Sequence, residues 1–246
     1  MKKQTMKNII FHFVCVILFF SIGCAKTQEL KVQQTEKPTT SGTVLKDTLP
    51  KTTETVPATI SGLVYGIKDI PKDIKYDGKV IASAKWSDKN GDNVIVITET
   101  DVKTTEIKSR PDDPELSKWL YGYHYVSNKL LWKIQDFVDQ CPAALDLTYI
   151  QNSLTITDIN NNGIAESTFL YMLGCRGDVS PVGLKLMMHE KDIKYALRGE
   201  TFIKYENVAE GGDIKEVDPS FKKAPDSFLD YAKKQWEKFK TEKLGN

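Results

Sequence analysis

Alternation of apolar and polar residues, repeated in short runs between turn signals, most constrains the fold of this 246-residue chain. A period of two is typical of strands with one buried face. Eight such runs lie at residues 80–87, 93–100, 121–128, 129–138, 153–157, 165–173, 182–190 and 193–202. Turn residues separate neighbouring runs, so we expect the runs to pair in hairpin order. The predicted fold class is therefore β-rich (α+β), an antiparallel sheet or sandwich of hairpins.

Three junctions carry the strongest turn chemistry. In the stretch DKNGD, residues 88–92, Asn90 precedes Gly91, and this pair accepts the positive φ angles of tight hairpins. Ser127-Asn128 and Lys191-Asp192 separate two further pairs of alternating runs. We expect a hairpin at each of the three positions.

The C-terminal stretch has the period of a helix instead. Its apolar residues fall on one face: Phe228, Leu229, Ala232, Trp236 and Phe239. We predict an amphipathic helix over residues 226–243, with Asp226 or Ser227 as its N-cap and Gly245 just beyond its end. The apolar face is expected to pack on the sheet, and the alternative is a face that binds a membrane.

The N-terminus has the composition of an export signal. Lysines precede an apolar run over residues 9–20, which is too short to cross the roughly 30 Å hydrocarbon core comfortably. The block SIGC, residues 21–24, resembles the lipobox of bacterial lipoproteins. That resemblance implies removal of a signal peptide over residues 1–23 and acylation of Cys24 as the first mature residue. The alternative is a simple secretory signal cut near Gly23, which leaves a free thiol.

Acylation of Cys24, with palmitate among the acyl groups, would hold the protein on a membrane, because each buried methylene adds about 0.8 kcal/mol. In the lipoprotein family an aspartate after the cysteine often marks inner-membrane retention, and Ala25 stands there instead. We therefore expect an outer-membrane lipoprotein, either periplasmic or exposed at the surface. Residues 24–57, rich in Thr, Lys, Gln, Glu and Pro, are expected to be a flexible tether. Residues 58–246 are expected to form a single globular domain.

The charge balance argues against one class of partner. The chain holds 34 Lys+Arg and 33 Asp+Glu, and residues 1–23 contain three lysines and no acidic residue, so the mature chain has 31 against 33. A net charge near −2 gives no reason to expect nucleic-acid binding.

Two cysteines remain in the body of the chain, Cys141 and Cys175, with a separation of 34 residues. In an oxidising compartment they are a candidate disulfide, and closing a loop of that size stabilises a fold by roughly 3–4 kcal/mol. Two separate buried thiols are the alternative. A metal site is not expected at either cysteine, because neither has a Cys-x-x-Cys partner or a nearby histidine.

The stretch TITDINNNGIAESTF, residues 155–169, contains a candidate calcium site. Oxygen ligands fall at positions 1, 3, 5, 7 (through the backbone carbonyl) and 9 of a nine-residue loop: Asp158, Asn160, Asn162, Ile164 and Glu166. Gly163 at position 6 allows the sharp turn. The spacing resembles the calcium loops between strands in FG-GAP repeats, and with only two carboxylates it predicts a weak Ca²⁺ site, on the order of 10⁻⁴–10⁻³ M. The alternative is a plain Asn-Gly hairpin turn.

The segment from residue 130 onward has a family resemblance. LLWKIQDFVDQCPAALDLTY, TITDINNNGIAESTFLYMLGCRGDVSPVGLKLMMHE and IKYALRG resemble a group of small Bacteroidetes-type lipoproteins that carry the label surface polysaccharide biosynthesis protein. The resemblance covers roughly residues 120–200 and centres on Trp132, Cys141, Asp158, Asn162, Gly163, Glu166, Cys175, Asp178, Pro181 and Gly199. It implies an envelope role connected with surface glycans, and no particular reaction or catalytic residue.

No motif singles out a catalytic residue, since Gly-x-Ser-x-Gly, phosphate-loop and His-Glu-x-x-His patterns are absent from the sequence. We expect His124 and His189 to be surface or half-buried residues. The predicted function is that of a lipid-anchored, non-enzymatic binding or accessory factor in the assembly or display of surface polysaccharide, with a surface glycan or an envelope protein as partner. Tyr121, Tyr123, Tyr125 and Trp132 are candidates for stacking on sugar rings, or for building a core. The alternatives are a glycan-modifying enzyme with an unassigned carboxylate pair and a protein-binding inhibitor or adhesin.

Overall fold

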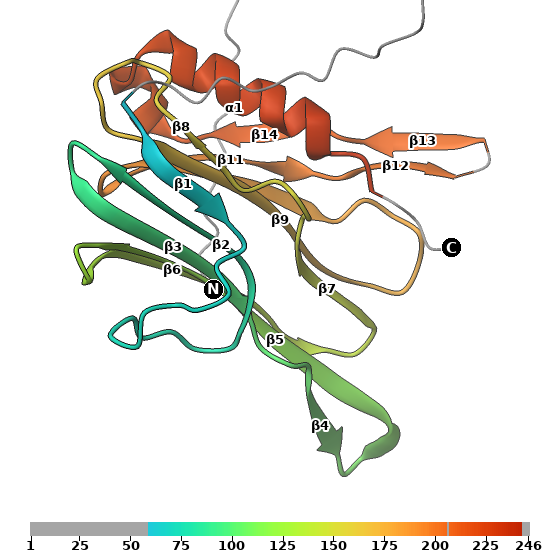
Figure 1. Cartoon of the computed structure of the whole chain (residues 1–246). Coiled ribbons are helices and arrows are strands. Elements are labelled where there is room, and N and C mark those ends of the chain that lie inside the picture. Colours follow the sequence, from blue (N-terminus) through green and yellow to red (C-terminus); the bar gives the residue numbers. More distant parts are fainter. Residues whose placement is uncertain (1–58, 206, 243–246) are drawn as a thin grey trace, which may run out of the picture. The chain divides into compact units, whose positions relative to one another are not determined.

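The computed structural model describes residues 59–205 and 207–242, which form two antiparallel sheets and a C-terminal helix (Figure 1). Most neighbouring strands in the sheets are also neighbours along the chain, as expected for hairpins. The β-rich α+β class predicted from the alternating pattern is therefore confirmed.

Sheet A contains the first six strands. They are β1 (Ser61–Tyr65), β2 (Lys79–Asp88), β3 (Gly91–Glu99), β4 (Lys103–Ile107), β5 (Arg110–Val126) and β6 (Lys129–Cys141). The 17-residue strand β5 pairs along one edge first with β4 and then with β3, and along its other edge with β6. β2 and β1 extend the sheet beyond β3.

Sheet B contains six later strands. They are β7 (Ala144–Tyr149), β8 (Thr155–Thr157), β9 (Glu166–Arg176), β10 (Gly183–Glu190), β11 (Ile193–Glu200) and β14 (Ile214–Val217). The order is β14-β11-β10-β9-β7, and β8 shares one edge of β9 with β7. β12 (Phe202–Tyr205) and β13 (Val208–Gly211) pair with each other in a two-stranded ribbon, and Phe202 of β12 also forms an isolated bridge with Thr241.

All three predicted hairpins are present. The closing pairs are Asp88 with Gly91, Val126 with Lys129, and Glu190 with Ile193. Ser127 and Asn128 have φ angles of 47° and 63°, so this two-residue turn uses the left-handed backbone that twisted hairpins require.

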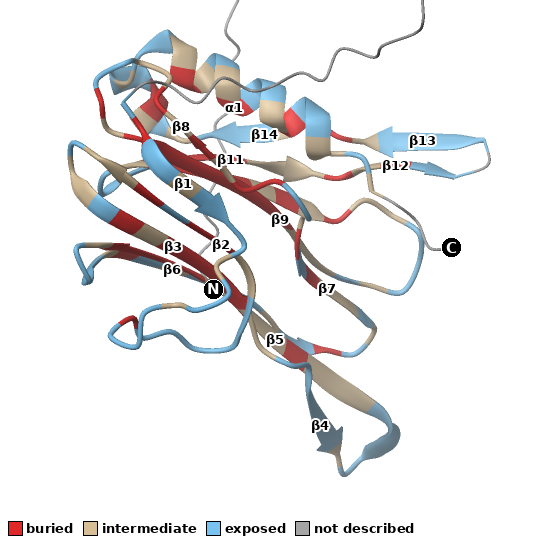
Figure 2. Cartoon of the chain, viewed as in Figure 1, coloured by how far each residue is buried: buried red, intermediate tan, exposed pale blue. Residues whose placement is uncertain are grey.

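Sheet B is buried on both faces. Consecutive side chains of a strand point to opposite faces, so Phe169 packs against sheet A while Leu170 packs toward the helix. The helix α1 (Asp226–Phe239) lies along this second face together with the short 3-10 helix η1 (Pro219–Lys223). Figure 2 shows the buried residues concentrated in the stacked strands, whereas β4 and β13 are exposed. The predicted packing of the helix on a sheet is confirmed.

The helix boundaries differ from the prediction. α1 ends at Phe239 and not at residue 243, because the next residues pair with β12: the Phe202 N–H donates to the Lys240 carbonyl, and the Glu242 N–H donates to the Phe202 carbonyl. The predicted N-cap is also wrong. Pro225 occupies that position, and no side chain caps the helix there.

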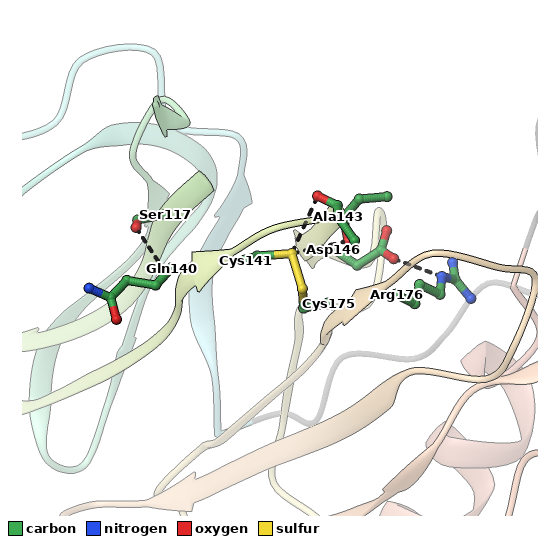
Figure 3. The surroundings of a disulfide bond; sticks show 8 residues. Ser117, Gln140, Cys141, Ala143, Asp146, Cys175 and Arg176 are labelled. Carbon is green, nitrogen blue, oxygen red and sulfur yellow. Dashed lines mark hydrogen bonds and ion pairs between the residues drawn. A yellow bond between two sulfur atoms is a disulfide. The ribbon is translucent and has the colours of Figure 1, made fainter. Parts of the chain in front are cut away.

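The disulfide predicted between Cys141 and Cys175 is present, with its Cα atoms 5.6 Å apart (Figure 3). Cys141 ends β6 of sheet A and Cys175 lies in β9 of sheet B, so the bond joins the two sheets. It lies at the end of the sandwich opposite the β5–β6 turn, because Cys141 pairs with Leu116, ten residues before Val126. The next residue, Arg176, forms an ion pair of 2.9 Å with Asp146 beside the bond.

The predicted signal peptide over residues 1–23, the acylated Cys24 and the tether over residues 24–57 lie outside the described residues. Among the helices of residues 59–242 that are described, none has the length and apolar character needed to cross a membrane.

Candidate functional site

A cleft of about 520 Å³ lies between sheet A and sheet B, and strands of both sheets form its walls. One wall comes from β6, and the other comes from β9, β10 and β11. Residues 132–136 of β6 line the cleft. Because side chains alternate along a strand, the lining residues of β10 recur at every second position: Lys185, Met187 and His189.

A row of aromatic rings lies at the inner end of the cleft. The Trp132 indole stacks on the His189 imidazole, with ring centroids 4.1 Å apart and an interplanar angle of 18°. His124 meets Trp132 edge-on at 5.5 Å, and Trp86 lies 5.2 Å beyond His124. The inner end of the cleft is therefore apolar and aromatic.

Both histidines of this row are buried, so the prediction of surface or half-buried positions is wrong. Burial lowers the pKa of His124 to about 4, and burial, with smaller contributions from His124 and Lys194, lowers the pKa of His189 to about 3. His124 Nε2 shares a 3.0 Å hydrogen bond with the Asn93 side chain. Both imidazoles are therefore uncharged at neutral pH, and they pack as aromatic rings against Trp86 and Trp132.

Asp136 is the centre of a polar group on the cleft wall. Its Oδ2 accepts hydrogen bonds from the Tyr171 hydroxyl at 2.9 Å and from Lys185 Nζ, and its Oδ1 accepts from the Phe137 N–H at 3.1 Å. Burial, and then the Asp136 carboxylate, raise the pKa of Tyr171 above its usual range, so this hydroxyl remains a donor. The contacts fix the direction of three polar side chains beside the aromatic row.

Two smaller hollows, of about 480 and 500 Å³, share Tyr149, Gln151, Asn152 and Lys238 as lining residues. The carboxylate in the second hollow, Glu242, is already paired with Arg176. Tyr65, an exposed tyrosine, lines the first hollow. The inter-sheet cleft is the stronger candidate because three polar side chains, those of Asp136, Tyr171 and Lys185, meet on its wall.

The predicted calcium loop connects β8 to β9. Asp158 at its start is buried, and its Oδ2 accepts from the Gly163 N–H at 3.0 Å and from the Thr59 hydroxyl. Gly163 has a φ of 86°, where a side chain would be strained, so glycine suits this turn. The hydrogen bond between loop positions 1 and 6 closes the loop on itself.

The two asparagines of the loop use both ends of their amides. Asn160 Oδ1 accepts from the Asn162 N–H at 3.0 Å, and Asn162 Oδ1 accepts from the Ile164 N–H at 2.8 Å. Their Nδ2 groups donate to the same atom, Glu190 Oε1, at 2.8 and 2.6 Å. Glu190 ends β10 and pairs directly with Glu166 of β9.

Glu166 is fully buried at the end of the loop. Its Oε2 accepts from the Ile159 N–H at 2.9 Å and from the Thr157 hydroxyl at 3.1 Å. Burial, opposed by these hydrogen bonds, raises the pKa of Glu166 to about 7. The structure thus brings the carboxylates of Asp158 and Glu166 to the same loop, as the spacing predicts.

No three His, Cys, Asp or Glu side chains converge as a metal-ligand group within the described residues. The expected calcium set contains only two carboxylates, at Asp158 and Glu166, and its other ligands are amide and backbone oxygens. Calcium binding at this loop therefore stays a prediction.

The tyrosines considered for sugar stacking belong mainly to a core on the outer face of sheet A. Tyr123 and Tyr125 are buried with Ile74 and Val96. Their hydroxyls accept from the backbone N–H groups of Asp77 and Lys75, at 3.1 and 3.2 Å. The alternative interpretation, that these alternating aromatics build a core, is the one that the structure shows.

Sequence reasoning singled out neither Asp136 nor Lys185 as a site residue. The sequence does indicate that each lies on an inward face of its strand, because Asp136 stands two residues from Ile134 and Lys185 stands two residues from Met187. What the sequence lacks is the stacking of the two sheets that makes these two faces meet.

The described residues thus present two candidate sites, the cleft between the sheets and the acidic loop between β8 and β9. A scan against protein-family models, a search of curated proteins and a search of solved structures each found no match for this chain.

Proposed function

We propose that the protein is a lipid-anchored envelope factor that binds a surface glycan and assists the assembly or display of surface polysaccharide without catalysing a reaction. The observation that carries this proposal is the inter-sheet cleft, where Trp132 lies beside the fixed polar group of Asp136, Tyr171 and Lys185. A sugar ring has an apolar C–H face and a rim of hydroxyls. A concave site that sets apolar side chains, here Ile134 and Met187, beside a few directed polar groups matches both parts.

The charged groups of the cleft support recognition of a polar ligand. Lys194, Arg198 and Asp192 are among the residues that line the cleft. Arg198 also pairs with Glu216 at 2.6 Å, so it is held in place as a hydrogen-bond donor. The hydroxyl groups of a sugar both accept and donate hydrogen bonds, so they can pair with cationic donors and with a carboxylate acceptor.

Binding is favoured over glycan cleavage by the state of the acidic residues. A glycosidase needs one carboxyl group to give a proton and a second to act as base or nucleophile. Both oxygens of Asp136 already accept hydrogen bonds, one of them from the ammonium of Lys185, and Asp192 lies exposed on the β10–β11 turn. Asp136 is therefore engaged by other groups of the protein, and Asp192 faces solvent.

The anchoring part of the proposal is supported by the sequence alone. The block SIGC ends at Cys24, and residues 25–57 supply enough polar chain to separate the anchor from the folded body. Tethering would keep a glycan-binding cleft close to the membrane where surface polysaccharide is assembled.

A glycan array probed with the full chain in detergent tests the proposal. The variants Tyr171→Phe and Lys185→Gln each remove one polar contact of the cleft, and each is expected to weaken binding about tenfold, which equals about 1.4 kcal/mol. Phe137→Ala is the matched control, because Phe137 is exposed on the opposite face of β6 and does not line the cleft.

Two results contradict the proposal. Glycan binding that is equal in Tyr171→Phe, Lys185→Gln and wild type would place the binding site outside the cleft. Release of shorter saccharides from a bound glycan, detected by mass spectrometry, would favour the enzymatic alternative.

A further inference from the structure

The loop between Asp158 and Glu166 is surrounded by more negative than positive charge. Four carboxylates contact it: Asp158 and Glu166 belong to it, Glu190 accepts from both asparagine amides, and Asp88 accepts from the Ala165 N–H at 2.9 Å. Within the described residues, one ammonium, Lys89 Nζ, donates a hydrogen bond to this loop. This charge excess by itself assigns no ligand.

A second and independent observation does point to a ligand. Asp158 is 3% exposed and Glu166 is 0% exposed, yet one oxygen of each carboxylate, Asp158 Oδ1 and Glu166 Oε1, has no hydrogen-bond partner. They are the only carboxylate oxygens of the described residues with this property. A buried acceptor without a donor destabilises a fold by roughly 1–3 kcal/mol, and a charged one by more. A bound cation would satisfy both oxygens.

Both side chains are directed at the same loop. Glu166 Oε2 accepts from the N–H of Ile159, the residue after Asp158, and so the Glu166 carboxylate lies at the first turn of the loop. Asp158 Oδ2 accepts from the Gly163 N–H across the loop. Because one oxygen of each group is held by the loop backbone, the unpartnered oxygens of the two carboxylates are both held beside this loop.

We propose that this loop binds one Ca²⁺ ion through Asp158, Asn160, Asn162, the Ile164 carbonyl and Glu166, and that Glu190 holds the two asparagines in position. Each asparagine Oδ1 has a second lone pair beside the one that accepts a backbone N–H, so it remains able to coordinate. The donors are all oxygens, which excludes a preference for zinc. The set is irregular and partly neutral, and so favours Ca²⁺ over the strictly octahedral Mg²⁺.

Glu190 is a positioning residue in this arrangement, and it lies outside the nine-residue spacing. Its Oε1 accepts from Asn160 Nδ2 and Asn162 Nδ2, so it draws the amide nitrogens away from the loop and orients the amide oxygens. Partners of this kind commonly change metal affinity by about 10-fold to 100-fold when they are removed. The register of β9 with β10 places Glu190 beside the loop, because Glu190 pairs with Glu166.

Lys89 competes with the ion. Its Nζ donates to the Asn162 carbonyl at 2.6 Å, and its side chain lies within 2.6 Å of where a Cβ on Gly163 would stand. A divalent ion in the loop would repel this ammonium. Removing the charge is therefore expected to tighten Ca²⁺ binding, a result that a purely structural loop would not produce.

Titration calorimetry with Ca²⁺ tests the proposal, using the full chain in detergent after treatment with a chelator. Wild type is expected to bind one Ca²⁺ with a Kd on the order of 10⁻⁴–10⁻³ M. Asp158→Asn and Glu166→Gln should bind too weakly to measure, Glu190→Gln should bind about tenfold more weakly, and Lys89→Gln about threefold more tightly. Asp92→Asn is the control, because Asp92 is exposed in the neighbouring β2–β3 hairpin and contacts Ser87 instead.

A thermal-unfolding scan with and without Ca²⁺ keeps the test decisive if Asp158→Asn folds poorly. Ca²⁺ should raise the melting temperature of wild type and, more strongly, of Lys89→Gln, whose side chain is exposed. No binding heat and no shift up to about 10 mM Ca²⁺, above the weakest such sites, overturns the proposal. Binding that is equal in Asp158→Asn, Glu166→Gln, Lys89→Gln and wild type, or tighter binding of Mg²⁺ than of Ca²⁺, overturns it as well.

Discussion

Lowering the pH from 7 to 5 should destabilise this protein through its two buried histidines. The pKa of His124 is about 4 and that of His189 about 3 in the folded protein, because both rings are buried between the sheets. In the unfolded chain each returns to about 6.5. Between these values the unfolded chain binds protons that the folded protein does not, so the free energy of unfolding falls as the pH falls.

The size of the effect follows from the same values. At pH 5 each histidine has lost about 2 kcal/mol of its contribution relative to pH 7, which gives about 4 kcal/mol for the pair. The charges facing these rings do not reverse the sign. Asp88 opposes the shift of His124, whereas Lys194 and His124 itself add to the shift of His189.

Glu166 acts in the opposite direction. Its pKa is raised by burial to about 7, so its contribution to stability is complete below the unfolded value of about 4.5 and is lost as the pH rises through 7. Between pH 7 and pH 5 it adds about 2 kcal/mol to the free energy of unfolding. The expected net loss for wild type is therefore about 2 kcal/mol, and Glu166→Gln should lose about 4 kcal/mol because the opposing group is gone.

Equilibrium unfolding in guanidinium chloride at pH 7 and pH 5, followed by tryptophan fluorescence and with a chelator present, measures both values. A wild-type protein that is more stable at pH 5 would contradict the reasoning. So would a Glu166→Gln variant with the same free energy of unfolding at both pH values, since its histidines would then be free to ionise in the fold.

Three further results are expected. Replacing Cys141 and Cys175 together by serine should lower the free energy of unfolding by roughly 3–4 kcal/mol, and an unchanged denaturant midpoint would show that the cross-link contributes little. Trp236→Ala should lower it by about 3–5 kcal/mol, because the ring is fully buried under sheet B, whereas Lys234→Ala on the exposed face of α1 should stay within about 0.5 kcal/mol in the same unfolding assay. Cys24→Ala should move the protein from the membrane fraction to the soluble fraction of lysed cells, and a variant that stays membrane-bound would count against acylation.

The parts of the fold that were predicted correctly depend on neighbours in sequence. The hairpin at Ser127-Asn128 follows from residues that tolerate positive φ, and the buried face of α1 follows from a period of 3.6. The end of α1 was missed because it depends on Phe202, a residue far away in the chain that pairs with Lys240 and Glu242. The helix propensity of residues 240–243 alone cannot predict a contact with a residue so far away in the chain.

The candidate sites divide in the same way. The spacing from Asp158 to Glu166 is local, and the sequence displays it. Glu190 reaches the loop only through the register of β9 with β10, and Asp136 becomes part of a cleft only when β6 faces β10. Alternation also divides the side chains of β5 between two faces, but it does not indicate which face is covered by the rest of the chain. Only the structure shows that Tyr123 is buried in a cluster with Ile74.

The contact between Thr59 and Asp158 has a mechanical consequence. Whatever is covalently attached before Thr59 enters the sandwich at the loop end, so a pull on the N-terminus is delivered there before it reaches the central strands. The Cys141–Cys175 bond fastens the two sheets at the far end and limits how far they can separate. Tension from the N-terminal side would therefore peel the fold open from one end, against a fixed hinge at the other.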